Sequence, residues 1–191
     1  MLLFLYFSLL FTAITRAQTP VGFSPNVTAH LDVIFSSVAV TPPGMNLTKA
    51  AVAKQPTIGT SDEALNGTYL FVMLDIDVPA SFTGGAAGTR GVNLHAMLTG
   101  FKSSGQTMSG TYILSSVATS PASYLAPAPP AEAPPHPHKY VELLFEQPAN
   151  WAVPSSQQSA VSNRLGFNLT QFTVAAGLGS PIRANYFQVA G

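Results

Sequence analysis

The sequence predicts a mainly β protein built from two packed sheets, with few short helices. Helical periodicity is nearly absent along its 191 residues. Short runs of β-branched and aromatic residues recur instead, separated by turns that contain Pro, Gly or Asn, and this pattern is typical of packed antiparallel sheets. The length and the hydrophobic fraction of 47% suit one domain with a substantial core.

In the first half of the chain, turn residues separate the expected strands. Strands are expected at His30–Phe35, Val38–Val40, Thr57–Thr60 and Tyr69–Val78. The turns between them contain Thr41–Gly44 and Asn66–Gly67. One short helix is expected at Leu47–Lys54, where Pro56 stops it.

In the second half, two unusual loops lie between the expected strands. The strands are expected at Val92–Phe101, Thr111–Val117, His138–Phe145, Phe172–Val174 and Tyr186–Val189. The segment Ser81–Gly91 holds four glycines and is interpreted as a flexible connector. The segment Ser120–Pro137 holds seven prolines, so it cannot join a sheet and should form a rigid, extended surface loop.

The beginning of the chain is typical of an exported protein. Residues Met1 to Ala17 combine an apolar core with small residues around a cleavage point after Ala17, which predicts a signal peptide followed by a single domain over residues 18–191. Four Asn-x-Thr sequons support this interpretation as glycosylation sites, at Asn26, Asn46, Asn66 and Asn168. We therefore expect a secreted, extracellular glycoprotein.

Charge and cysteine content exclude several classes of function. Eight basic residues balance eight acidic ones, and the basic residues are scattered, which argues against nucleic-acid binding. The absence of cysteine excludes disulfides, thiol nucleophiles and cysteine metal sites. The first apolar run is too short and too early for a convincing membrane span, so none is expected in the mature chain.

Two carboxylates end the most hydrophobic run of the mature chain. Asp75 and Asp77 follow six apolar residues that begin at Tyr69, a composition that indicates a strand buried on both faces. Residues two apart on a strand share a face, and Pro79 marks the end of the strand. Carboxylates beside a core are costly unless they are paired or hydrogen-bonded. Some other group should therefore satisfy or use them.

Two histidines and a tyrosine on other expected strands are candidates to meet these aspartates. If the strands bring His95, His138 and Tyr140 to Asp75 and Asp77, they form a pocket with two imidazoles, a phenol and two acceptors. A neighbouring anion raises the pKa of an imidazole, so such a pocket could receive an anion such as phosphate. Taken alone, a histidine in a strand is more often a hydrogen-bonded structural residue, and Tyr140 is more often a core or rim aromatic. For the two aspartates, a structural and a functional role are about equally favoured.

Three other kinds of site suit these residues less well than an anion pocket does. His136 and His138, with His95 and Asp75, could form a zinc site, but Pro137 restricts both neighbouring rings and no His-Glu-x-x-His pattern is present. No Gly-x-Ser-x-Gly elbow indicates a serine hydrolase. Asp75 and Asp77 could also be the two carboxylates of a glycosidase, but a buried pair lined by histidines is poorly suited to a sugar cleft.

The order of these motifs resembles the phosphatidylethanolamine-binding protein family, also called the Raf-kinase-inhibitor-protein family. The matching segments are Gln55–Ile58, Asp75–Ala80, Asn93–Leu98, Tyr124–Pro130, His138–Tyr140, Phe145–Gln147 and Pro181–Gln188. Together they span nearly all of the mature chain. The departures from the family pattern are Ile76, Asn93, Ala126, Ala128 and Lys139.

The resemblance implies a two-sheet β-sandwich with a small pocket for phosphate-type anions or phospholipid head groups. By position, the residues of that pocket would be Asp75, Asp77, Pro79, His95, Pro129, His138 and Tyr140. The function expected is binding without catalysis, cofactor or metal. The alternative is a protease or kinase inhibitor, or another interaction module, that acts through surface loops such as Ser120–Pro137.

Overall fold

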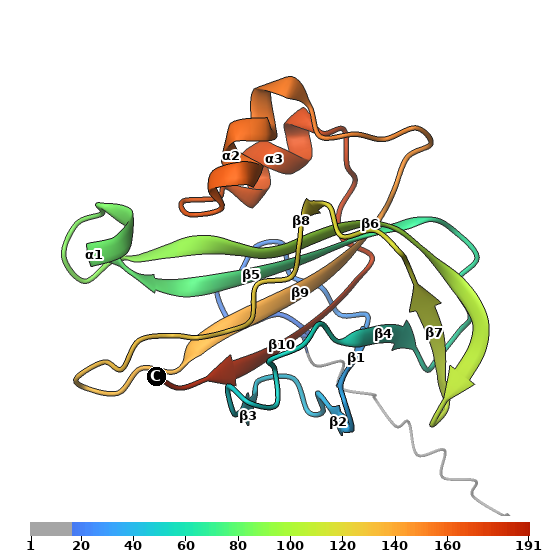
Figure 1. Cartoon of the computed structure of the whole chain (residues 1–191), viewed down its shortest axis with the longest axis horizontal. Coiled ribbons are helices and arrows are strands. Elements are labelled where there is room, and N and C mark those ends of the chain that lie inside the picture. The colour runs from blue at the N-terminus through green and yellow to red at the C-terminus, as the bar shows by residue number, and fades with distance from the viewer. Residues whose placement is uncertain (1–16) are drawn as a thin grey trace, which may run out of the picture.

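The computed structural model describes residues 17–191 as one curled, mainly β structure (Figure 1). The predicted signal peptide lies outside the described residues except for its last position, Ala17. The strands are β1 (Asp32–Phe35), β2 (Val38–Ala39), β3 (Met45–Leu47), β4 (Thr57–Thr60), β5 (Tyr69–Pro79), β6 (Arg90–Met108), β7 (Thr111–Ser115), β8 (Pro121–Ala122), β9 (His138–Glu146) and β10 (Arg183–Val189). The helices are α1 (Ala80–Thr83), the 3-10 turn η1 (Ser155–Gln157), α2 (Gln158–Asn163) and α3 (Leu169–Ala175).

The strands follow one another in the order β2-β1-β4-β7-β6-β5-β9-β10-β3, with β8 added to β6. The long strand β6 joins two layers, because its first part pairs with β5 and its last part pairs with β7. Neighbouring strands are antiparallel, except that β3 runs parallel to β10. The sheet therefore folds over on itself, which confirms the prediction of a two-sheet, mainly β fold.

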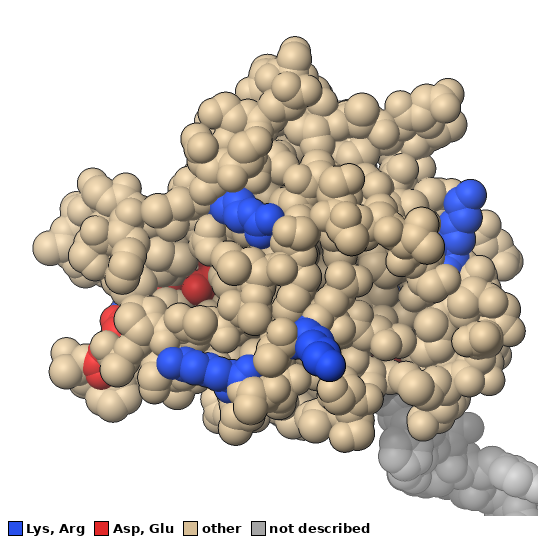
Figure 2. All heavy atoms as spheres, viewed as in Figure 1, with Lys and Arg blue, Asp and Glu red and all other residues tan. Residues whose placement is uncertain are grey.

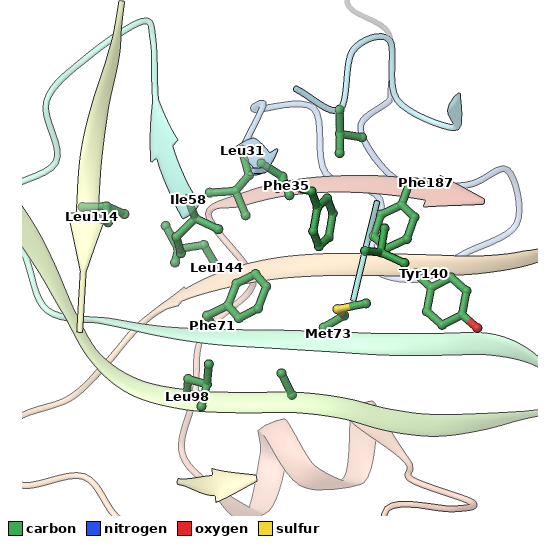
Figure 3. Close-up of a cluster of buried hydrophobic side chains, with 14 of the residues drawn as sticks. Leu31, Phe35, Ile58, Phe71, Met73, Leu98, Leu114, Tyr140, Leu144 and Phe187 are labelled. Carbon is green, nitrogen blue, oxygen red and sulfur yellow. The ribbon is translucent and has the colours of Figure 1, made fainter. Parts of the chain in front are cut away.

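The main core fills the space between the two layers. Side chains of β1 and β4, such as Phe35 and Ile58, face Phe71 and Leu144 on the opposite layer (Figure 3). Phe187 packs against Phe35 edge to face, with ring centroids 5.1 Å apart. Burial of these apolar side chains is the main favourable contribution to folding, at about 25 cal/mol per Å² removed from water.

A second core lies on the outer face of β5, β6 and β9, under helices α2 and α3 (Figure 1). Leu70, Val72 and Leu74 of β5 face this side and meet Val161 of α2 and Phe172 of α3. Strand β5 is therefore buried on both faces, as its continuous apolar sequence predicts. No helix within residues 17–191 is long and apolar enough to cross a membrane.

Three predictions about the elements are wrong. The segment Ser120–Pro137 does join a sheet, because its residues Pro121–Ala122 form β8, which pairs with β6. The helix expected at Leu47–Lys54 is absent, because Leu47 ends β3 and turns follow it. The strand expected at Phe172–Val174 is part of α3, whose buried Leu169 and Phe172 are three residues apart on one helical face. Asn168 caps this helix by accepting a hydrogen bond from the N–H of Gln171 at 3.0 Å.

Candidate functional site

The end of β5 places two buried aspartates in different surroundings. The pairing between β5 and β6 is irregular between Asp75 and Val78, and the N–H of Asp77 donates to Asp75 Oδ1 at 2.9 Å. Such an irregularity interrupts the alternation of side chains along a strand. Asp75 consequently lines a cavity, whereas Asp77 is not among the residues that line it.

His138 is held between two carboxylates. It begins β9, the neighbour of β5, and its Nδ1 donates to Asp75 Oδ2 at 2.8 Å. Its Nε2 donates to Glu132 Oε1 at 3.0 Å. Ionised carboxylates only accept hydrogen bonds, so this geometry favours the doubly protonated, cationic imidazole. Burial opposes this charge, but the bonds to Asp75 and Glu132 raise the pKa of His138 above its ordinary value.

His95, on β6, has the opposite electrostatic character. Its Nδ1 donates to the carbonyl of Leu125 at 2.8 Å, and its Nε2 lies 3.2 Å from the amide Nδ2 of Asn93. Burial lowers the pKa of His95, so the neutral ring is favoured. The ring also contacts Tyr140 edge to face at 5.1 Å. In this form Nε2 accepts a hydrogen bond from Asn93.

Asp77 organises the end of the proline-rich loop. Its Oδ2 accepts hydrogen bonds from the backbone N–H of Lys139 at 2.8 Å and from Lys139 Nζ at 3.2 Å. Its Oδ1 accepts from His136 Nε2 at 3.1 Å. Burial opposes ionisation, but these bonds lower the pKa of Asp77. The carboxylate therefore anchors the start of β9 beside the cavity.

The cavity has a polar floor and an apolar rim, with a volume of about 250 Å³. Its lining residues are Asp75, Val78, Pro79, Phe82, Asn93, His95, Leu125, Ala126, Ala128, Pro129, Pro130, His138, Tyr140 and Leu165. The rim includes three large apolar side chains that remain substantially exposed: Phe82 at 58%, Leu125 at 44% and Leu165 at 43%. A polar group with an apolar extension fits this distribution.

Three separate parts of the chain supply the rim. Phe82 belongs to α1, which directly follows β5, and Leu125 lies in the proline-rich loop. Leu165 follows α2 and forms an isolated bridge with Asn93. Arg164 holds this arrangement together, since its Nη1 donates to the carbonyl of Ser123 at 2.9 Å.

Tyr140 links the cavity to the core. Its ring stacks on Phe187 with centroids 5.3 Å apart, and it stands at one end of the core cluster in Figure 3. Burial raises the pKa of Tyr140, and the charge of Asp75 with the hydrogen bond between the two side chains raises it further. The hydroxyl therefore stays protonated and faces the floor of the cavity.

A larger hollow on the surface lacks comparable chemistry. It has a volume of about 430 Å³, lies between β8 and α2, and is lined by Thr99, Ser120, Pro121, Trp151, Ala152, Val153, Gln158, Val161 and Ser162. None of these side chains ionises in the ordinary pH range. Within residues 17–191, no group of three or more His, Asp or Glu side chains could hold a metal ion. The smaller cavity is therefore the candidate site.

The model of the family named Phosphatidylethanolamine-binding protein matches residues 37–187. The chain belongs to this family. The match covers both layers of the sheet and every strand that contributes to the cavity.

Relatives of this phosphatidylethanolamine-binding protein family member have varied names. "Phomoidride biosynthesis cluster protein N" of Talaromyces stipitatus is 33% identical over 100% of this chain and 99% of its own length. The "26 kDa secreted antigen" of Toxocara canis is 29% identical over 92% of this chain and 62% of its own length. The solved structure of a carboxypeptidase Y inhibitor complexed with its cognate proteinase has a TM-score of 0.60 at 17% identity, covering 86% of this chain and 84% of that one.

The structure brings together six of the seven pocket residues expected for a family member. Asp75, Pro79, His95, Pro129, His138 and Tyr140 line the cavity, and Asp77 lies behind it. The geometry differs from the expected pocket in which neighbouring carboxylates raise the pKa of both imidazoles, because His138 bonds to carboxylates and His95 does not. The Nδ1–H of His95 donates to the carbonyl of Leu125. The Nε2–H of His138 donates to Glu132.

Sequence reasoning missed two charged residues beside the cavity, Arg90 and Glu132. Arg90 Nη1 donates to Glu132 Oε1 at 2.8 Å and to the carbonyl of Asp77 at 3.1 Å. One signal was present, because Glu132 is the only Asp, Glu, Lys or Arg between Lys102 and Lys139. Because the proline-rich loop leads directly into His138, its one charged residue, Glu132, could have been predicted to pair with that histidine.

Proposed function

We propose that this family member is a binding protein without catalytic activity, whose cavity receives a phosphate-type ligand or a phospholipid head group. The observation that supports this proposal most is the cationic His138, fixed by Asp75 in the floor of an otherwise largely apolar cavity. A buried positive charge in surroundings of low polarity attracts an anion more strongly than it would in water.

The size and lining of the cavity agree with an amphiphilic ligand. A volume of about 250 Å³ suits a head group better than a whole lipid. The exposed rim residues Phe82, Leu125 and Leu165 offer an apolar surface for the part of the ligand that emerges. The amide of Asn93 could turn from His95 to a phosphate oxygen.

We further propose that the protein is secreted and glycosylated, as a single domain over residues 18–191 after cleavage of residues 1–17. All four sequon asparagines, Asn26, Asn46, Asn66 and Asn168, are exposed. A glycan on any of them would extend into solvent. The name of the Toxocara canis relative, a secreted antigen, agrees with this location.

Isothermal titration calorimetry with O-phosphorylethanolamine tests the binding proposal. The wild-type protein should bind this head group, and His138→Ala should weaken binding at least roughly tenfold, since a charge-assisted hydrogen bond is lost. His30→Ala is the matched control, because His30 lies outside the cavity. Asn93→Ala provides a second variant. Asn93 is half-buried, so its replacement should disturb folding less than replacement of the buried His138. Equal affinity in all four proteins would refute the proposal.

The alternative function, inhibition of a protease or kinase through surface loops, stays a prediction. The likeness to the carboxypeptidase Y inhibitor, at 17% identity, is a likeness of fold. Replacement of loop residues 126–135 with a Gly/Ser segment tests this alternative. Inhibition that survives His138→Ala but is lost with the loop would favour it over ligand binding.

A further inference from the structure

A single oxygen of Glu132 occupies a position where two cationic donors converge. Glu132 Oε1 accepts from Arg90 Nη1 at 2.8 Å and from His138 Nε2 at 3.0 Å. The hydrogen bond with Arg90, assisted by that with His138, lowers the pKa of Glu132 to about 2. The carboxylate is therefore an anion bound by the protein itself, beside the cavity.

The two donors are held in place by contacts other than Glu132. His138 is fixed by Asp75 through its other nitrogen. Arg90 begins β6 and donates to the backbone carbonyl of Asp77 at 3.1 Å. If Glu132 moved away, both donors would still point to the same place. The structure therefore contains a preorganised position for an anionic oxygen.

Glu132 itself is on an element that can release it. It lies in the proline-rich loop between Pro130 and Pro134, and its neighbours Ala131 and Ala133 are exposed. Its side chain keeps 18% of its surface accessible, against 2% for that of His138. Moving this carboxylate exposes only a loop side chain to water, whereas moving His138 would disrupt a strand.

Glu132 and Arg90 line a second hollow, which gives the Glu132 side chain space to move. The hollow lies beside α1, has a volume of about 610 Å³, and is lined by Pro79, Ala80, Ser81, Gly84, Gly85, Ala87, Gly88, Thr89, Arg90 and Glu132. Pro79 lines both this hollow and the cavity, so the two adjoin. Figure 2 shows acidic atoms between α1 and the loop that runs below it, on a face that is otherwise mostly uncharged.

We propose that the position of the Glu132 carboxylate is the anion subsite of the cavity, and that Glu132 competes there with the phosphate oxygen of a ligand. This inference rests on the proposed function. An incoming phosphate oxygen takes the place of Oε1 between His138 and Arg90, and Glu132 turns toward the hollow beside α1. Glu132 is thus a specificity-determining residue, because it disfavours any anion that binds too weakly to displace it.

Titration of Glu132→Gln with O-phosphorylethanolamine and, separately, with inorganic phosphate tests this inference. The variant keeps the shape of the side chain and removes its charge, so it should bind the anion roughly tenfold more tightly than wild type. Measurement at about pH 6, below the ordinary histidine pKa of about 6.5, favours the protonated form of His138, which Asp75 still stabilises in the variant. Glu146→Gln is the matched control, since Glu146 is an exposed carboxylate at the far end of the same strand as His138.

The outcomes separate this inference from the proposed function. Tighter binding by Glu132→Gln than by Glu146→Gln supports the competition, and the probe that gains more shows whether a head group or free phosphate is preferred. Binding that is weakened by His138→Ala but unchanged or weakened by Glu132→Gln overturns the competition and leaves the proposed function standing. Failure of wild type and Glu132→Gln to bind either probe overturns both.

Discussion

Asp75 and His138 join the ends of two neighbouring antiparallel strands through a hydrogen bond of 2.8 Å from Nδ1 to Oδ2. The strands β5 and β9 pair so that Asp75 lies opposite Tyr140, which places His138 diagonally across from the carboxylate. Both side chains are almost fully buried, with 6% and 2% of their surface accessible. This pair therefore stabilises the sheet and fixes the cation in the cavity.

Asp75→Asn should lower the free energy of unfolding most at mildly acidic pH. The raised pKa of His138 in the folded state means that its contribution is complete below about pH 6.5, the ordinary histidine pKa, and is lost as pH rises through the folded value. We expect a loss of about 3 kcal/mol near pH 6 and a smaller loss near pH 9. Urea denaturation at both pH values measures the difference.

Asp62→Asn is the control for this experiment. The Asp62 side chain pairs with Arg183 but is 64% exposed, so the change should cost less than about 1 kcal/mol. A loss for Asp75→Asn that is equal at the two pH values would contradict the role assigned to the charged His138.

Glu142→Met should stabilise the protein at neutral pH. Glu142 is fully buried on β9, and neither carboxyl oxygen has a hydrogen-bond partner among the described residues. Burial raises the pKa of Glu142 well above its ordinary value. The unfolded chain ionises above about pH 4.5 while the folded protein stays protonated, so wild type loses stability as pH rises from there. Removing the polar group should add about 1–3 kcal/mol at pH 7.

The Glu142→Met gain should shrink toward pH 4, where the carboxyl is protonated in both states. Glu142→Gln provides the matched comparison, since it removes the titration but keeps a buried polar group. A gain for Glu142→Met that does not depend on pH would contradict the raised pKa of Glu142, and a loss at pH 7 would contradict the cost assigned to its buried carboxyl.

Asn168→Ala should destabilise the protein by about 1 kcal/mol through the loss of the α3 cap. The Asn168 side chain accepts a hydrogen bond from Gln171 at 3.0 Å. The same change removes a sequon, so Thr170→Ala serves as the control, because it removes the sequon and keeps the cap. Thermal unfolding of unglycosylated protein should distinguish the two variants. Equal melting temperatures would argue against the cap.

Gly59→Ala should destabilise the protein by roughly 1–3 kcal/mol, because it overpacks a site with no room. A Cβ at Gly59 in β4 would collide with the backbone carbonyl of Tyr112 in the neighbouring β7. Gly179→Ala is the control, since nothing lies within 4 Å of its Cβ position and its φ is not left-handed. Denaturant midpoints of the two variants check the prediction, and similar midpoints would contradict it.

Local sequence pattern predicted the strands that lie in both cores. The run that begins at Tyr69 indicated burial on both faces of β5, because neither face carries polar residues before Asp75. The pattern failed at α3, where Phe172 to Val174 favour a strand locally but pack as a helix on the sheet. The sequence did contain two signals for this helix: Asn168 is a favourable N-cap residue, and the apolar Leu169 and Phe172 are three residues apart. The prediction overlooked both.

The gathering of site residues was predicted better than their hydrogen bonds. The residue types of Asp75, His95 and His138 on separate expected strands were consistent with one pocket, and the family resemblance implied it. The roles of Arg90 and Glu132 depend on how a long loop folds back over the end of the sheet, and no local pattern encodes that contact. The tautomer of a histidine likewise depends on its partners in the fold.

A crystal structure of the protein with O-phosphorylethanolamine would show whether His138 binds the phosphate. We expect the phosphate group in the cavity, with one oxygen within hydrogen-bond distance of His138 Nε2, and the ethanolamine directed toward the rim at Leu125. A phosphate bound only elsewhere, such as in the hollow between β8 and α2, or a cavity that stays empty at saturating ligand, would contradict this expectation.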